Sequence, residues 1–378
     1  MVVMALIHRN RLLTGALFAA LAIGVVMGMS SAFLAHSRPA ASGGVLVQSP
    51  QVSSVNMLRQ RFETLLDGDL ERIRPNYLVE DLGGEYAWDK ERERTRYFRA
   101  WLLERGLTLT SASAWFEVDS IASLGRGSYR LEITEHGLYE YRPSANPSGP
   151  THAFGSRTVH VMEIAFSEDR WRIAYDWYAD PLGDSAIDPS KGQIAPSASG
   201  TRPAPAQEFD RGKAAEYVLR YSGVRSLPGG GKYNRSYQVY SYVGGDCANF
   251  VSQVLAAGGL PQDYGWAYSR GGSASWTCSQ DLIWHLMGSG TGRRVYWGTF
   301  AGALLPLPGE PRGAIGLLQP GDVIGYEISG EVAHVAVVAG FDPSGWPVIA
   351  SHTADRLYFP WDLGWNRDTV FCFIHIVY

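Results

Sequence analysis

A segment without apolar periodicity divides this chain of 378 residues. In Gly183–Gln207, 16 of the 25 residues are Pro, Gly, Ser or Ala, a composition typical of flexible linkers. A chain of this length corresponds to about two or three ordinary domains. We therefore expect an N-terminal domain over residues 52–182 and a C-terminal domain over residues 208–378.

Composition excludes several classes of protein. The chain is 46% apolar and 19% charged, which excludes a wholly disordered or fibrous protein. It has 33 basic against 37 acidic residues, so no basic excess indicates a nucleic-acid partner. Three cysteines exclude a disulfide scaffold and a four-cysteine zinc site. One cysteine could still serve as a nucleophile.

The N-terminus has the pattern of an export signal. Arg9 and Arg11 precede Leu12–Leu34, which is 23 residues without a charge. A helix of that length, at about 1.5 Å per residue, can cross a bilayer core. Two interpretations of residues 1–36 stay open, a cleaved signal peptide and an uncleaved membrane anchor. Both predict an extracytoplasmic protein that contacts the membrane only through this segment.

The N-terminal domain is predicted to be α+β. Apolar residues at helical spacing predict one helix around residues 57–70 and a second over residues 88–105. Strand-like runs follow at residues 108–118, 128–141 and 157–178, the last broken by a turn at 167–170. Two helices before a curled antiparallel sheet resemble the cone-shaped NTF2-like fold. Three tryptophans in these strands could stack on sugars, but we expect them to pack in the core: Trp115, Trp171 and Trp177.

One cysteine lies at a predicted helix start. Gly244 and Gly245 permit a tight turn, and Asp246 is a favoured N-cap residue, so Cys247 becomes the first helical residue. The apolar face of this helix continues to the glycine pair at 258–259, which ends it. Aligned peptide dipoles and free N–H groups at such a position lower the pKa of a thiol and can bind an oxyanion. The alternative is a small buried hydrophobic residue.

A hairpin downstream supplies histidines. Residues 332–341 form a nearly continuous apolar strand in which His334 is the one polar residue, and residues 347–353 return. Asp342-Pro-Ser-Gly345 suits a bulged three-residue loop, which places His352 on the same face as His334. A two-residue loop would instead place Thr353 opposite His334.

A catalytic thiolate usually needs an imidazole partner that a third polar group orients. Cys247, His334 and His352 supply these types, so we expect catalysis rather than a core histidine bonded to backbone. The same three residues could bind zinc, although they lack the close spacing of common zinc sites. We therefore expect no metal site.

Three blocks of the C-terminal domain carry a family resemblance. They read GGDCANFVSQVLAAGG, QPGDVIGYEISGEVAHVAVVAGFD and VIASHTAD, after the opening FDRGKAAEYVLRYSG. Over about residues 208–378 the sequence resembles the bacterial amidase-domain family, itself similar to NlpC-type, papain-like cysteine peptidases. The resemblance implies a papain-like α+β hydrolase domain.

The resemblance also implies roles for particular residues. Cys247 would be the nucleophile, His334 the base and His352 the polar third member. In the NlpC-type relatives, the residue at the position of Asp246 helps to hold a substrate amine, and a tyrosine corresponding to Tyr242 lies beside the nucleophile. The resemblance therefore implies both as substrate-binding candidates. Ala248 departs from the Thr or Ser that these families usually have after the cysteine.

The sequence therefore predicts an exported cysteine amide hydrolase. We expect it to act on cell-wall peptides through an acyl-thioester and to need no cofactor. Acyl transfer in place of hydrolysis would use the same residues. The alternative prediction is a catalytically silent papain-like module that binds cell wall or protein. The sequence indicates no oligomeric state.

Overall fold

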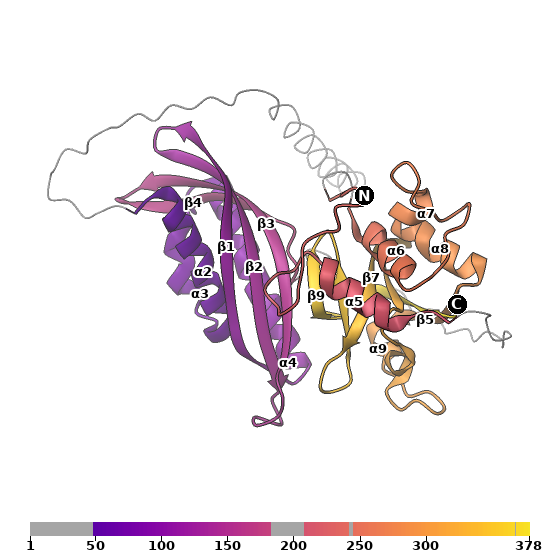
Figure 1. The fold of residues 1–378 in the computed structure, drawn as a ribbon. Helices are drawn as coiled ribbons and strands as arrows, with labels where there is room; N and C mark the ends of the chain where they lie inside the picture. The colour runs from indigo at the N-terminus through magenta and orange to yellow at the C-terminus, as the bar shows by residue number, and fades with distance from the viewer. Residues whose placement is uncertain (1–47, 183–207, 242–244, 367) are drawn as a thin grey trace, which may run out of the picture. The chain divides into compact units, whose positions relative to one another are not determined.

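The structure is a computed structural model that describes residues 48–182, 208–241, 245–366 and 368–378 (Figure 1). The predicted export segment and the predicted linker Gly183–Gln207 lie outside these ranges, so both stay predictions. Among the described residues, no helix combines the length and the apolar character needed to cross a membrane.

Residues 48–182 have the predicted order of helices followed by antiparallel strands. The helices are α2 (Pro50–Asp67), α3 (Leu70–Ile73) and α4 (Leu82–Glu104), with a 3-10 turn at Arg74–Asn76. The strands are β1 (Leu107–Gly125), β2 (Ser128–Pro143), β3 (His152–Ser167) and β4 (Arg170–Trp177).

Local sequence explains where these elements start and stop. The side chain of Ser49 caps α2 by accepting a hydrogen bond from the Val52 amide at 3.4 Å. Gly68 ends α2 with a left-handed φ of 78°, and its amide donates to the carbonyl of Thr64. Glu168 and Asp169 adopt φ of 50° and 61°, the backbone of a two-residue hairpin turn between β3 and β4.

The first part packs its helices onto its strands. Helix α2 contacts β1 and helix α4 contacts β4 (Figure 1). The expectation that the three tryptophans pack in the core is wrong for two of them, because Trp115 is 38% exposed and Trp177 is 49% exposed. The core beneath the helices instead contains Met57, Leu58, Ile73, Tyr77, Trp88, Leu131, Ile133, Met162, Ile164 and Ile173.

The described part of residues 208–378 begins with four helices and ends with five successive strands. The helices are α5 (Arg211–Tyr221), α6 (Cys247–Ala257), α7 (Ala274–Thr277), α8 (Ser279–Ser289) and α9 (Phe300–Ala303), with a 3-10 helix at Gly313–Leu317. The strands are β5 (Gly292–Thr299), β6 (Val323–Ile328), β7 (Glu331–Phe341), β8 (Pro347–Ser351), β9 (Asp355–Pro360) and β10 (Val370–Ile376). The structure is consistent with the predicted α+β class, and its named strands pair antiparallel.

One sheet includes strands from both parts of the chain. Its order is β1-β2-β3-β9-β8-β7-β6-β10-β5, with β4 paired to β3. Strands β3 and β9 pair antiparallel, from Gly155 with Leu357 to Arg157 with Asp355. A shared core cluster also contains Phe62 and Phe98 from the helices of the first part and Tyr326 and Phe359 from the second.

Strand β7 separates two cores, and this separation positions the candidate site. Val335 and Val337 belong to the core that includes Phe250 of α6 and Leu282 of α8. Ala336 and Val338 belong to the other core, together with Tyr326. Side chains alternate along a strand, so each residue of β7 points to one of two faces. We call the face toward the core with Phe250 the α6 face, and the face toward the core with Tyr326 the Tyr326 face.

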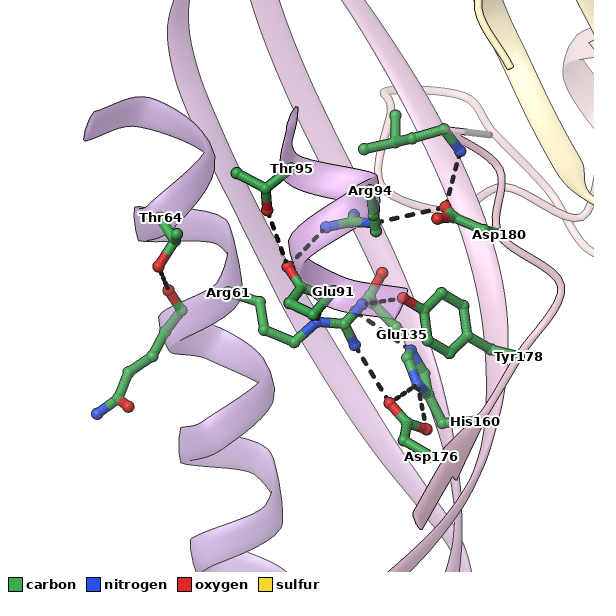
Figure 2. A network of polar contacts seen from close by, with 12 residues as sticks. Arg61, Thr64, Glu91, Arg94, Thr95, Glu135, His160, Asp176, Tyr178 and Asp180 are labelled. Atoms are coloured by element: carbon green, nitrogen blue, oxygen red, sulfur yellow. Dashed lines mark hydrogen bonds and ion pairs between the residues drawn. The ribbon is translucent and has the colours of Figure 1, made fainter. Parts of the chain in front are cut away.

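A network of buried charges lies between the helices and the strands of the first part (Figure 2). Arg61 of α2 donates to Glu91 of α4 at 2.6 Å and to the Tyr178 hydroxyl at 2.7 Å, and it lies 3.5 Å from Asp176. Nδ1 of His160 bonds Asp176 at 3.0 Å. Arg94 and Asp180 extend the network, joined at 3.4 Å. The network therefore ties both long helices to the end of β4.

The network predicts a pH-dependent stability. Burial opposes the charged form of His160, but Asp176 and Glu135, the latter 3.4 Å from Nε2, outweigh it and raise the pKa of His160. When the pKa of a histidine is higher in the folded than in the unfolded state, its protonated form stabilises the fold. This stabilisation is complete below the unfolded-state pKa of about 6.5 and is lost as the pH rises through the folded-state pKa. The free-energy advantage of the protein over His160→Gln should thus be largest below about pH 6.5 and shrink as the pH rises above it.

Urea unfolding at a series of pH values measures this difference. His285→Gln is the control, because that ring is partly exposed and lies in the second part of the chain, outside this network. A difference between the protein and His160→Gln that does not vary with pH would show that His160 is not stabilised as a cation.

Candidate active site

Helix α6 begins at Cys247, as the sequence predicts. Gly245 has a φ of 123°, and a Cβ there would lie 3.2 Å from the Thr353 hydroxyl, so glycine fits this approach turn. Asp246 occupies the N-cap position and Cys247 the first helical position. The helix ends at Gly258, and Gly259 follows with a φ of 95°. The cysteine therefore lies at the helix N-terminus.

Asp246 does not cap the helix through its side chain, which corrects the expectation for this residue. Its Oδ1 accepts hydrogen bonds from the Tyr240 amide at 2.9 Å and from Asn249 Nδ2 at 2.8 Å. Its Oδ2 lies 2.6 Å from Nδ1 of His352, and its amide donates to the Thr353 hydroxyl at 2.7 Å. The carboxylate is buried and fixes the approach loop rather than facing an open cleft.

His352 lies on the α6 face and holds this loop in place. Nε2 of its ring lies 2.9 Å from the carbonyl oxygen of Tyr221, and Nδ1 contacts the Asp246 carboxylate. Both partners present oxygen atoms that can accept a hydrogen bond. The ring is stacked between Tyr233 and Phe250, at centroid distances of 3.9 and 4.0 Å. His352 thus joins α5, the start of α6 and the end of β8.

The thiol of Cys247 is buried among apolar side chains and 7% exposed. Its Sγ lies 3.2 Å from the hydroxyl of Ser279. Burial raises the pKa of the thiol, and hydrogen bonds from Ser279 and from the backbone of Val335 and Ala248 lower it by less. The expected lowering by the helix N-terminus is therefore wrong in direction, because desolvation of the sulfur is the larger effect.

His334 lies on the other face of β7 from Cys247. Its ring is 5.6 Å from the Tyr326 ring and 5.5 Å from the Trp365 ring, both on the Tyr326 face. Burial and the charge of Arg356 lower the pKa of His334 to about 3, so the ring is neutral. Its Nε2 is buried and makes no hydrogen bond within the described chain. The predicted contact between Cys247 and His334 is not formed.

The predicted hairpin loop is confirmed, but the predicted register of the histidines is wrong. The Asp342 amide donates to the Trp346 carbonyl at 2.8 Å, and Gly345 has a φ of 80°, as the bulged three-residue loop requires. Next to the loop, Phe341 pairs with Pro347 and Gly340 pairs with Val348, as the three-residue loop predicts. One extra residue, Ala339, then shifts the register, so His334 and His352 lie on opposite faces.

The remaining site predictions concern a metal and a tyrosine. The described part of the chain holds no group of three or more His, Cys, Asp or Glu residues that could bind a metal ion. The alternative zinc site of Cys247, His334 and His352 is not assembled, since His334 lies on the other face of β7. Tyr242 lies outside the described residues.

Two residues that contact the site were not predicted. Ser279, the first residue of α8, lies against the sulfur, and Thr353 holds the Asp246 amide. A signal for Ser279 was present, because it is a polar residue at a helical spacing shared with Leu282, Ile283 and Leu286, all buried.

Comparisons with known proteins find one family match and one curated relative. Residues 208–375 match the family described as Putative amidase domain. This match suggests an amide hydrolase in general. The uncharacterized protein YhbB of Bacillus subtilis (strain 168) is 26% identical over 208 residues, which cover 52% of this chain. The aligned region spans 58% of the length of that relative.

One comparison is with a solved structure, the intermembrane space region of the chloroplast protein ARC6. That region is 17% identical, with a TM-score of 0.24, and the match covers 35% of this chain and 97% of that chain.

Proposed function

We propose that residues 208–378 hydrolyse an amide bond through an acyl-thioester on Cys247. The observation that carries this proposal is the placement of the sulfur at the first position of α6, inside the segment that matches the amidase family. The Ser279 hydroxyl lies 3.2 Å from that sulfur, where it can donate a hydrogen bond that favours the thiolate form.

The proposed reaction has two steps. The Cys247 thiolate attacks the amide carbonyl, and the free N–H groups at the start of α6 stabilise the oxyanion that forms. The C–N bond breaks as the amine leaves with a proton, which gives the thioester. Water then attacks the thioester, the C–S bond breaks, and the carboxylate product and the thiol are released.

His334 remains the proposed base, and a local rearrangement would bring it to the sulfur. In β7, Tyr326 pairs with His334 and Glu327 pairs with Val332, so Ala333 is an extra residue in the strand. Bulges are common beside active sites, where they change the direction of a side chain. Moving this bulge by one residue would take His334 out of its position opposite Tyr326.

Cell-wall peptides outside the cytoplasm are the proposed substrates. The uncharged stretch Leu12–Leu34 supports export. The resemblance of residues 208–378 to NlpC-type peptidases supports a peptidoglycan stem peptide. The proposed papain-like fold of residues 208–378 rests on this same resemblance. The proposed NTF2-like fold of residues 52–182 rests on the predicted order of two helices before an antiparallel sheet.

A second candidate function is a silent module that binds the cell wall without turnover. One observation favours it: the ring of His334 and the sulfur of Cys247 lie on opposite faces of β7. Without a base in contact, a thiol whose pKa burial raises stays protonated at neutral pH.

Acid-quenched mass spectrometry separates the two functions. The full chain is mixed with peptidoglycan and with synthetic stem peptides, and the Cys247 peptide is examined for an acyl adduct. The enzyme predicts the adduct together with new amine and carboxyl termini, and His334→Ala should remove both. The silent module predicts sedimentation with peptidoglycan and neither product. Products without a Cys247 adduct, unaffected by Cys247→Ala, would contradict the proposed function.

A further inference from the structure

We infer that Ser279 is a thiolate-stabilising residue, whose hydroxyl donates a hydrogen bond to Sγ of Cys247 once the thiol loses its proton. This inference deepens the proposed function and rests on Cys247 being the nucleophile. It assigns a role to a residue that lies 32 positions from the cysteine and belongs to none of the motifs described above.

The contact has only one possible direction in the reactive state. Between a neutral thiol and a hydroxyl, either atom can donate, and the distance of 3.2 Å suits both arrangements. A thiolate has no proton to donate. The Ser279 hydroxyl must then turn its own hydrogen toward the sulfur, which makes the bond charge-assisted and stronger than before.

Within the described residues, the Cys247 sulfur is the hydrogen-bond partner of this hydroxyl. Ser279 is the first residue of α8 and is 8% exposed, on the buried face that also carries Leu282, Ile283 and Leu286. An apolar residue would complete that face, so the serine introduces a polar atom into a core. The Cys247 sulfur is its side-chain partner there, and a buried hydroxyl without a partner would destabilise the fold.

The position of His334 makes this donor matter more. In a Cys–His pair, an adjacent imidazolium stabilises the thiolate. In the structure His334 is neutral and lies on the other face of β7, so before the proposed rearrangement no imidazolium stabilises the thiolate and hydrogen bonds must do so. Within the described chain, Ser279 is the side chain that can donate to the sulfur, and substitution can remove this donor.

Titration of the thiolate tests the inference without any substrate. Ultraviolet absorbance of the full chain minus that of its Cys247→Ala counterpart isolates the Cys247 thiolate. Ser279→Ala should raise the midpoint by about one pH unit, which lowers the thiolate fraction below the midpoint about tenfold. Ser279→Thr keeps the hydroxyl and should stay close to the unmodified protein.

Two comparisons protect the test from a folding artefact. Ser279→Thr and Ser279→Val have the same shape and differ only in the hydroxyl, so Val alone should raise the midpoint even if Ser279→Ala unfolds. Ser252→Ala removes another buried serine hydroxyl, which bonds Trp276 and Trp266, and should leave the midpoint unchanged.

Equal midpoints for the Thr and Val variants, or a comparable shift in Ser252→Ala, would overturn the inference. Failure of the proposed function would be seen in a different experiment. If Cys247→Ala hydrolysed amides at the full rate, Cys247 would not be the nucleophile, but the titration would still show whether Ser279 stabilises the thiolate.

Discussion

Amide hydrolysis is expected to fall by about 10,000-fold or more when Cys247 is replaced with Ala, because the thioester cannot form without the sulfur. The substitution keeps the Cβ that packs in the core beside Phe250 and Val335 and removes one buried atom. The fold should therefore persist, so the loss reports on chemistry. Release of amine from stem peptides measures the rate, and circular dichroism verifies the fold.

Cys278→Ser provides the matched control. Cys278 is exposed and precedes α8, so its thiol can change without altering the buried site. We expect this variant to hydrolyse amides at the rate of the unmodified protein. Activity of Cys247→Ala within a few fold of the control would place the reaction on another residue and refute the nucleophile assignment.

The sequence was most informative where structure is determined locally. Glycine and aspartate before Cys247 predicted the start of α6, and Asp342 with Gly345 predicted the three-residue loop, because caps and turns depend on a few adjacent residues. The bulge at Ala339 depends on how β7 and β8 fit between two cores, which no local pattern reports. That single residue reversed the predicted relation of His334 to His352.

Contacts between distant segments were the other limit. His352 was expected to orient His334, yet it bonds Asp246, 106 positions away in the chain. Ser279 and Arg61 each interrupt an apolar helical stripe with a polar residue, and both lie buried against a specific partner. A polar residue at a core position of a helix is therefore a usable signal, but its partner becomes identifiable only in three dimensions.

Replacing Arg61 with Met is expected to lower the free energy of unfolding by about 3–5 kcal/mol, because it leaves buried carboxylates without their cation. Arg61 and Glu91 are 2% and 1% exposed at their side chains and joined at 2.6 Å, and Asp176 lies 3.5 Å away on the other side of the guanidinium. Chemical denaturation of the full chain, followed by circular dichroism and tryptophan fluorescence, measures the loss.

Arg59→Met is the matched control, because Arg59 lies on the same helix and is exposed. Within the described chain, its side chain donates a hydrogen bond to Asn56 at 2.8 Å. It should change stability by less than about 0.5 kcal/mol. The double variant Arg61→Met/Glu91→Leu should lose less than the sum of its single variants, because removing both charges of a buried pair leaves neither unpaired. Strictly additive losses would mean that Arg61 and Glu91 are not coupled, and that the network in Figure 2 does not join α2 to α4 energetically.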